Sequence, residues 1–378
     1  MTSHEKDIKM WTPFTMVLLL VIGLGALVIF YRLVNGLGAA TNLNDRFPWG
    51  LWIGFDVLGG VAMAAGGFLI AGAVYILNWK KYKPIVRPAV LTAFFGYLLA
   101  ATAIMFDIGV PWRIWHPAVM WQIHSVMWVV AIHVILYTLT LATESSPMIF
   151  EKLKMNAALT FVKKIMVPVV LFGVLLSVLH QSSLGAVYLI VPHKLSNLWY
   201  SSQLPTLFLV SAVMMGLSMV SLENIISSKA FNHKPNMEIL SGLARGTLIA
   251  AVIYGALKLI KLFKGGIGSA FDGSLEANMF LLEMLVGVII PIVLLLSRKV
   301  RASINQILFV DILVVAGILL NRLNVAVFGV YRDQSATGLS YFPTLMEFIV
   351  TLALVAAAIF GFKLAAKYLR LFPEPEGA

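Results

Sequence analysis

The sequence of 378 residues contains no cysteine. Disulfide bonds and iron–sulfur clusters held by cysteine thiolates are therefore excluded from this chain. Charge is also scarce: only 12% of the residues are charged and 60% are hydrophobic, whereas about 25% are charged in a typical soluble domain. This composition excludes an ordinary soluble protein, and any redox role requires an electron carrier on another chain.

The hydrophobic residues fall into ten long runs. Each run is about as long as a helix that crosses a hydrocarbon layer of about 30 Å. The connections between runs are too short for a separate soluble domain, which needs about 50 residues or more. The sequence therefore predicts a single all-α polytopic membrane domain over residues 1–378, with transmembrane helices near 13–33, 51–77, 85–106, 118–142, 160–180, 203–226, 243–263, 275–297, 304–326 and 344–367.

The distribution of basic residues predicts the orientation of these helices. The net charge is +11, which in a soluble protein would suggest a nucleic-acid partner. In a membrane protein, basic residues instead concentrate on the cytoplasmic side. The two tails and the even-numbered loops hold 19 of the 28 Lys and Arg residues, and the odd-numbered loops hold 9. We therefore expect a protein of the bacterial inner membrane with both termini in the cytoplasm and no nucleic-acid partner.

The loops predicted on the outer side are rich in Gly, Pro and Trp. Two examples are the segments 47–52 and 111–117. Tryptophan is common at the membrane interface of any membrane protein. The density of these residue types also favours an ordered outer surface that receives a partner protein.

Ionisable side chains inside the predicted helices are candidate functional groups, because each costs about 2.5–3.5 kcal/mol to insert at the helix centre. We expect Asp56, His124 and His180 toward the outer side. Tyr97 and His133 lie near the middle of their predicted helices, and Glu223 and Asp311 lie toward the cytoplasm. The pattern contains no metal-binding cluster.

The polar segment from His180 to Gly185 stands at a predicted membrane boundary. An imidazole beside an amide and two hydroxyls can donate to a quinone carbonyl and relay protons. His124 and His180 are predicted near the outer ends of two antiparallel helices. They could bracket one group, either a haem iron through two imidazoles or a quinone carbonyl through one of them. His133 is nine residues from His124 and is expected on the opposite helix face.

Glu223 and Asp311 have two interpretations. They could pair with nearby Lys or Arg residues, or they could begin a proton path from the cytoplasm that passes Tyr97 and His133. A third class of function, secondary ion transport, would use Asp56, Glu223 and Asp311 as coupling acids. No strongly interrupted pair of core helices is predicted, which argues against a transporter.

Five motifs occur in order along the chain: residues 48–56, Arg87-Pro88-Ala89, Phe95-Gly96-Tyr97, His180–Gly185 and Tyr341–Glu347. With these motifs the sequence resembles the polysulfide-reductase membrane-subunit (NrfD-like) family, and within it the hydrogenase-2-type branch. The resemblance implies two four-helix bundles with flanking helices and no prosthetic group. It also implies exchange of electrons with menaquinone or ubiquinone near the outer face.

The same resemblance implies partners and site residues. Electrons would pass through a ferredoxin-like iron–sulfur subunit on the periplasmic side, which connects to the small and large subunits of a nickel–iron hydrogenase. Tyr97, His180 and Glu223 match positions for quinone and proton work. Related sequences often carry an acid on the fourth helix where this chain has Val129, so His133 or His124 would have to replace it. The alternative interpretation is a b-type cytochrome with haem b held by His124 and His180.

Overall fold

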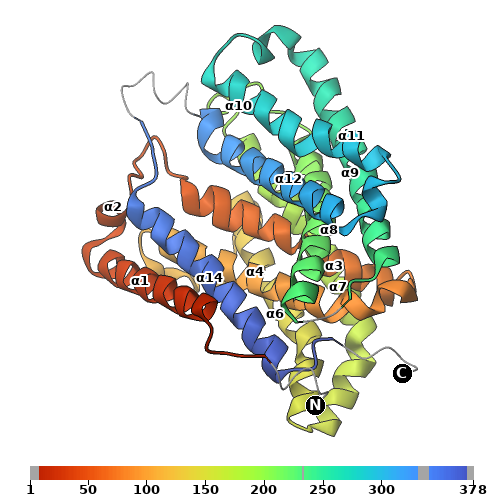
Figure 1. Ribbon diagram of the computed structural model, residues 1–378. Coiled ribbons are helices and arrows are strands. Elements are labelled where there is room, and N and C mark those ends of the chain that lie inside the picture. The colour runs from red at the N-terminus through yellow and green to blue at the C-terminus, as the bar shows by residue number, and fades with distance from the viewer. Residues whose placement is uncertain (1–7, 232–233, 331–339, 373–378) are drawn as a thin grey trace.

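The computed structural model describes residues 8–231, 234–330 and 340–372. In these ranges the chain is helical, and it contains ten segments that are long and apolar enough to cross a membrane. The all-α class predicted from the sequence is confirmed. The ribbon in Figure 1 shows these long helices running alongside one another.

The ten long segments have the following bounds: α1 (Pro13–Asn35), η2 with α3 (Trp52–Gly59 and Gly60–Tyr75), α4 (Val86–Asp107), α6 (Val126–Lys152), α7 (Asn156–Val187), α8 (Leu204–Ala230), α9 (Met237–Gly265), α10 with η7 and α11 (Leu275–Met284, Leu285–Ile289 and Ile290–Leu296), α12 with η9 (Ile304–Leu323 and Asn324–Phe328) and α14 (Leu345–Tyr368). Short helical turns occupy the connections: α2 (Leu37–Ala40), η3 (Lys80–Ile85), η4 (Pro111–Arg113), α5 (His116–Val119), η5 (Tyr188–Ile190), η6 (Ile267–Ala270) and η8 (Val300–Ala302).

Three of the long segments contain a π-helical turn, in η2, η7 and η9. Such turns are rare in helices and frequently occur at functional sites. η2 is the longest of the three and carries Asp56. The insertion of this turn changes which side chains share a face, so Asp56 is not in simple helical register with Gly60 and the small residues that follow it.

The long helices form two bundles and a flanking pair. Helices α3, α4, α6 and α7 pack together as the first bundle, and α8, α9, α10–α11 and α12 form the second. Helices α1 and α14 pack on each other, and α14 also rests on α4 (Figure 1). This is the arrangement of two four-helix bundles with flanking helices that the family resemblance implies.

The two bundles meet where α3 crosses α8. At the crossing, a Cβ atom added to Gly216 would lie 2.6 Å from the backbone nitrogen of Gly66. Only glycine allows this approach, because a side chain at either position would collide with the other backbone. The small residues of these helices therefore position the bundles, as is common at helix contacts in membranes.

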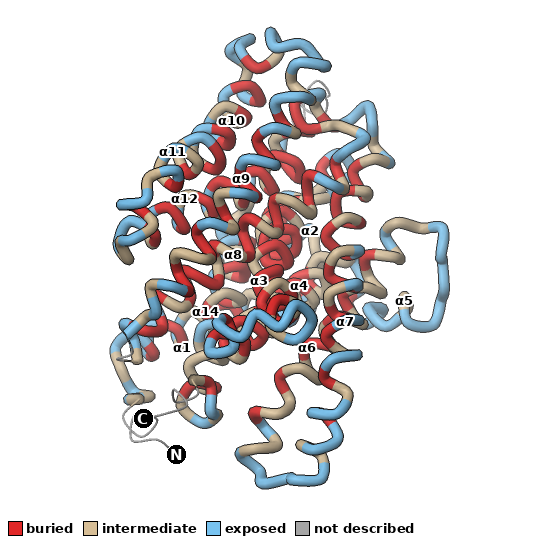
Figure 2. The backbone as a smooth tube through the Cα atoms, turned by 90° about the vertical axis from the view of Figure 1, so that its right-hand side faces the viewer, coloured by how far each residue is buried: buried red, intermediate tan, exposed pale blue. Residues whose placement is uncertain are grey.

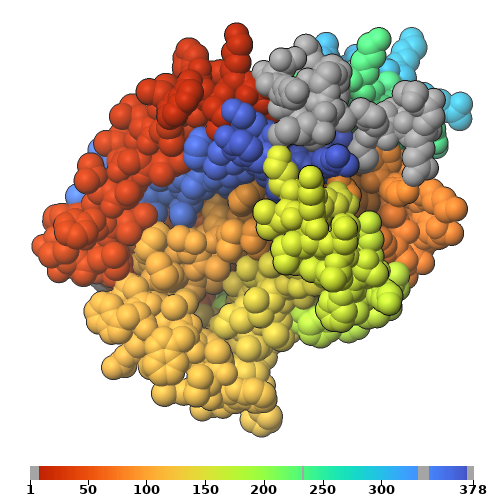
Figure 3. All heavy atoms as spheres, turned by 90° about the horizontal axis from the view of Figure 1, so that it is seen from below, coloured from red at the N-terminus to blue at the C-terminus, as the bar shows by residue number. Residues whose placement is uncertain are grey.

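The start of α1 and the end of α14 lie on one side of the molecule, which we call the terminal side. The connections from α1 to η2, α4 to α6, α7 to α8 and α9 to α10 lie on the opposite side, as do the end of η9 and the start of α14. The connection from α4 to α6 projects from the body in Figure 2. In this connection, the exposed fractions of Trp112, Trp115 and Trp121 are 68%, 53% and 70%. The end of α4 and the segment after it form the amber lobe in Figure 3.

Candidate functional site

His180 lies in the interior of the first bundle and has no exposed surface. It is seven residues from the end of α7 at Val187, which corresponds to about 10 Å at 1.5 Å per residue. Neither nitrogen of its imidazole ring has a hydrogen-bond partner among the described residues. Such a buried and unsatisfied polar group is costly, so it calls for a functional explanation.

The polar residues that follow His180 in the sequence belong to the same helix, α7. The sequence predicts a helix end at residue 180, but α7 continues to Val187. The helix thus extends seven residues past the predicted end, and the polar side chains that follow His180 are buried or half-buried within the helix bundle. The Gln181 amide donates to the carbonyl oxygen of Val61 at 2.9 Å, and the Ser183 hydroxyl donates to that of His180 at 2.9 Å.

Two rings from neighbouring helices border His180. The centroid of the Tyr97 ring, on α4, lies 5.5 Å from that of His180 in an edge-on arrangement. The His133 ring, on α6, lies 6.0 Å away, and its Nδ1 atom is 3.5 Å from the Ser183 hydroxyl. The structure thus brings three of the predicted site residues together, each from a different helix of the first bundle.

Tyr137 and Ser177 extend this group and were not predicted from the sequence. The rings of Tyr97 and Tyr137 are 4.6 Å apart, and both side chains are buried. The Ser177 side chain lies beside the phenol groups of both Tyr97 and Tyr137. None of the three hydroxyl groups forms a well-aligned hydrogen bond among the described residues. The spacing from His133 to Tyr137, four residues on one helix face, is the signal that could have identified Tyr137.

Asp56 occupies a different part of the molecule. It is fully buried, and its Oδ2 atom accepts a hydrogen bond of 2.7 Å from the Thr351 hydroxyl on α14. Its Oδ1 atom has no partner among the described residues. Asp56 therefore lies between the first bundle and the flanking pair, and none of its described hydrogen bonds reaches the His180 group.

The Tyr341–Glu347 motif has a structural role on the opposite side. The Glu347 carboxylate accepts hydrogen bonds from the Tyr341 hydroxyl and from the backbone nitrogens of Asn42 and Thr344. The Tyr341 hydroxyl in turn accepts from the backbone nitrogen of Leu51 at 2.8 Å. Burial is the main factor that raises the pKa of Tyr341, and the hydrogen bond to Glu347 raises it further. These contacts fasten the loop before η2 onto the start of α14.

His124 does not lie where the sequence predicts it. Helix α6 begins at Val126, because the Ser125 hydroxyl caps it by accepting from the backbone nitrogen of Trp128. His124 is therefore in a connection and is exposed, whereas His180 is buried in the bundle. The predicted bracketing of one group by His124 and His180 is wrong, and this pair does not fit a haem iron.

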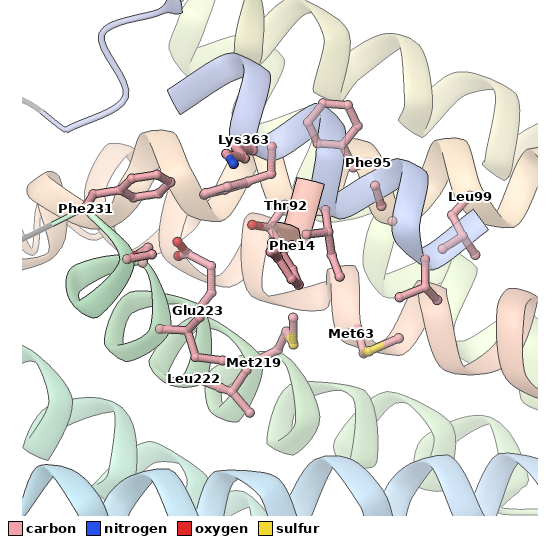
Figure 4. A pocket seen from close by; sticks show the side chains of 18 of the residues that line it. Phe14, Met63, Thr92, Phe95, Leu99, Met219, Leu222, Glu223, Phe231 and Lys363 are labelled. Atoms are coloured by element: carbon pink, nitrogen blue, oxygen red, sulfur yellow. The ribbon is translucent and has the colours of Figure 1, made fainter. Parts of the chain in front are cut away.

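Glu223 lines a large cavity of about 910 Å³ between the first bundle, α8 and the flanking pair. Figure 4 shows its carboxyl group pointing from α8 into this space, with the Lys363 side chain on the facing wall. The Lys363 amine is held by the hydroxyls of Thr12 and Thr15. Both carboxyl oxygens of Glu223 lack a partner among the described residues. Most of the other lining side chains are apolar, including Met63, Phe95, Leu99, Met219 and Leu222.

Asp311 lies across α8 from this cavity. Its carboxyl group is beside Ser218 and Ser221, which face away from the cavity that Glu223 lines. The predicted path through Glu223, Asp311 and His133 is therefore not one continuous set of contacts. Within the described ranges, no cluster of three or more His, Cys, Asp or Glu residues could hold a metal ion. The three acids predicted for a transporter do not share a site.

A buried ion pair organises the second bundle and was not predicted as a unit. Lys258 donates to Glu283 at 2.8 Å, and both side chains are almost completely buried. Glu283 also accepts hydrogen bonds of 2.8 to 2.9 Å from the side chains of Trp199, Asn321 and Asn324. Its carboxylate is thus fully satisfied, in contrast to those of Asp56 and Glu223.

The donor set around His180 fits a quinone. A quinone carbonyl is a hydrogen-bond acceptor, and His180 and Tyr97 are buried donors with free hydrogen-bonding capacity. Neither side chain lines the cavity of about 910 Å³, which borders the same helix α4 at Thr92 and Gly96.

Comparisons with known proteins agree with this arrangement. The family model described as "Polysulphide reductase, NrfD" matches residues 39–332. The "Probable Ni/Fe-hydrogenase 2 b-type cytochrome subunit" of Escherichia coli is 31% identical over 92% of this chain and 89% of its own. The "Menaquinone reductase, integral membrane subunit" of Nitratidesulfovibrio vulgaris is 28% identical over 97% and 92%. The "Hdr-like menaquinol oxidoreductase integral membrane subunit" of Archaeoglobus fulgidus is 24% identical over 92% and 94%.

The family model covers most of the chain, and the Escherichia coli relative is more than 30% identical over nearly its whole length. The ten apolar helices are in keeping with both matches. The chain therefore belongs to the NrfD family and is a multi-pass membrane subunit of a redox enzyme complex.

Proposed function

We propose that the chain is the quinone-reactive membrane subunit of a respiratory nickel–iron hydrogenase. One observation carries this proposal: His180 and Tyr97 meet inside the first bundle with free hydrogen-bonding groups. The name of the Escherichia coli relative supports a hydrogenase. Because this chain contains no cysteine, electrons would come from another chain, a ferredoxin-like iron–sulfur subunit linked to the small and large hydrogenase subunits.

The substrate we propose is menaquinone, since two relatives carry menaquinone or menaquinol in their names. Reduction of a quinone takes up two electrons and two protons and forms an O–H bond at each carbonyl oxygen. His180 would donate a hydrogen bond and a proton to one carbonyl, and the Tyr97 hydroxyl would do the same at the other. His133, close to the Ser183 hydroxyl, would return a proton to His180.

For the orientation, we propose that the terminal side faces the cytoplasm and the opposite side faces the periplasm. The excess of Lys and Arg in the loops of the terminal side supports this assignment. His180 is then nearer to the periplasmic surface, where the iron–sulfur partner would dock. The membrane would be the bacterial inner membrane.

We also propose that Glu223 serves as a proton entry group. Its cavity borders Thr92 and Gly96 of α4, the helix that carries Tyr97. Asp311 remains a predicted member of a proton path, although α8 separates it from Glu223. A carboxyl group with no partner in an apolar cavity can take up and release protons without breaking a structural ion pair.

The identity of the complex is tested by purification from membranes in mild detergent. We expect this chain to co-purify with an iron–sulfur subunit and a nickel–iron subunit pair, and to lack the Soret and α bands of haem b. Purification with a catalytic subunit that holds a different metal would contradict the hydrogenase assignment. Haem bands that persist in the His124→Ala variant and vanish in His180→Ala would favour the cytochrome alternative.

A further inference from the structure

The His180 group continues as a line of polar side chains toward the terminal side of the first bundle. Below Tyr97 come Tyr137 and Ser177, and beyond them Glu144 of α6. Glu144 is 18 residues from the start of α6 at Val126, about 27 Å along the helix, whereas His133 is about 10 Å along it. Along α6 the line therefore covers about 17 Å, a little more than half of a hydrocarbon layer of about 30 Å.

Gly173 of α7 leaves room for the Glu144 carboxyl group beside Tyr137. A Cβ atom on Gly173 would lie 2.8 Å from the Glu144 carboxyl Oε1 atom and 3.5 Å from the Tyr137 ring. The carboxyl group and the phenol thus border the same small volume, which only a glycine leaves free. Since side chains on α6 point back toward the helix start, Glu144 reaches toward Tyr137.

The carboxyl group of Glu144 differs from the structural carboxylates of this protein. Glu283 accepts hydrogen bonds from four side chains, and Glu151 is paired with Arg87 at 2.8 Å. Oε2 of Glu144 is buried and has no partner among the described residues. The hydroxyls of Tyr137, Ser177 and Tyr97 are buried and unsatisfied in the same way. Orphan polar groups at this depth are costly, and ordered water typically satisfies them.

At its terminal-side end the line reaches the surface. The Tyr75 side chain, at the end of α3, is 40% exposed and interacts electrostatically with both Glu144 and Arg87. Arg87 is partly exposed and lies in the ion pair with Glu151. Tyr75 is therefore the side chain that we expect to link Glu144 with the terminal side.

We propose that Glu144, Tyr137, Ser177 and Tyr97 form a proton route through the first bundle to His180, separate from the cavity that Glu223 lines. This inference rests on the proposed quinone site at His180. For each quinone reduced, two electrons arrive from the iron–sulfur partner and two protons are consumed. The route returns protons to Tyr97 and His180 after each has donated to one quinone oxygen.

The route is tested in the purified complex by hydrogen-linked reduction of a soluble menaquinone analogue as a function of pH and in D₂O. Glu144→Gln is expected to slow this reaction at least fivefold, with a changed pH profile, while reduction of a viologen dye by the partner subunits is unchanged. Tyr137→Phe is expected to slow it and to increase the D₂O effect. Thr140→Val is the matched control, because the Thr140 hydroxyl already donates to Leu136 of its own helix.

Gly173→Ala provides an independent variant, since its methyl group would displace the Glu144 carboxyl group. If this variant does not assemble, Glu144→Gln and Tyr137→Phe decide the question. Wild-type rates and pH profiles in both of these, together with loss of activity in His180→Ala, would overturn the route and leave the quinone site intact. Wild-type activity in His180→Ala would instead overturn the quinone site itself.

Discussion

The Tyr97 ring stands edge-on to the imidazole of His180, with 5.5 Å between the ring centroids, in the interior of the first bundle. Tyr97 comes from the middle of α4 and His180 from the last third of α7. Neither side chain has a hydrogen-bond partner among the described residues. A purely structural pair would be expected to satisfy these groups, so the arrangement favours a site that binds an exchangeable acceptor.

The first prediction concerns Tyr97. Tyr97→Phe removes the hydroxyl but keeps the ring that packs on Tyr137 and His180. We expect quinone-linked turnover to fall about tenfold, because one hydrogen bond to the substrate or one proton donor is lost. Tyr254→Phe is the matched control: Tyr254 is also buried with an unsatisfied hydroxyl, but it lies in the second bundle. Equal losses in both variants would show that the effect of Tyr97 is not specific.

The second prediction concerns Glu223. Glu223→Gln keeps the shape of the side chain in its cavity and removes the ability to exchange a proton. We expect slower proton-coupled turnover with normal assembly of the complex, measured by the rate of quinone reduction and by size-exclusion chromatography. Unchanged turnover would remove Glu223 from the proton path. Met219→Leu, on the same cavity wall, is the control for packing.

The third prediction concerns the ion pair of the second bundle. Glu283→Ala leaves Lys258 charged, buried and unpaired, which typically costs about 3–5 kcal/mol. We expect a clear loss of thermal stability of the solubilised protein. Glu151→Ala breaks the partly exposed pair with Arg87 and should cost less than about 1 kcal/mol. Similar melting temperatures for the two variants would contradict the structural role assigned to Glu283.

The fourth prediction concerns the contact between the bundles. Gly216→Ala places a methyl group where only the backbone of Gly66 fits, so we expect reduced yield and lower thermal stability. Gly23→Ala in α1 meets no atom within 4 Å and should be neutral or slightly stabilising. Thermal unfolding of the two variants, compared with the parent protein, checks this difference.

The fifth prediction concerns orientation. The chain has no cysteine, so a single introduced cysteine is a unique label site. Ser202→Cys lies on the opposite side and Ala302→Cys on the terminal side, and both positions are exposed. In intact spheroplasts, a membrane-impermeant maleimide should label Ser202→Cys, and it should label Ala302→Cys only after permeabilisation. The reverse pattern would place the termini in the periplasm.

Long hydrophobic runs were enough to predict the helices, because a segment that crosses the membrane must be apolar over most of its length. Helix ends were harder to predict. The run that ends near residue 142 was predicted to begin at residue 118, but the Ser125 cap starts α6 at Val126. Because the helix starts after this cap, His124 lies outside it and away from His180. Similarly, α7 extends past His180, because its polar residues face the bundle interior rather than water.

Side chains that join different helices were only partly predictable. His180, Tyr97 and His133 were recognised as polar residues in apolar runs, and the fold brings them together. Tyr137, Ser177 and Glu144 were missed, because tyrosine and serine are unremarkable in membrane helices and Glu144 falls just beyond the predicted helix end. Only the packing of α6 against α7, with Gly173 between them, shows that they form one line. Asp311 and Glu223 were predicted on one path, but α8 separates them.

The quinone site is tested most directly by the ratio of quinone-linked to dye-linked hydrogen oxidation in the purified complex. The dye takes electrons from the partner subunits, so the ratio isolates the step at this chain. In His180→Ala we expect the ratio to fall at least tenfold, while in His124→Ala, whose side chain lies exposed outside the helix, it should stay at the parent value. An unchanged ratio in His180→Ala, or an equal fall in both variants, would contradict the assignment of His180 to quinone reduction.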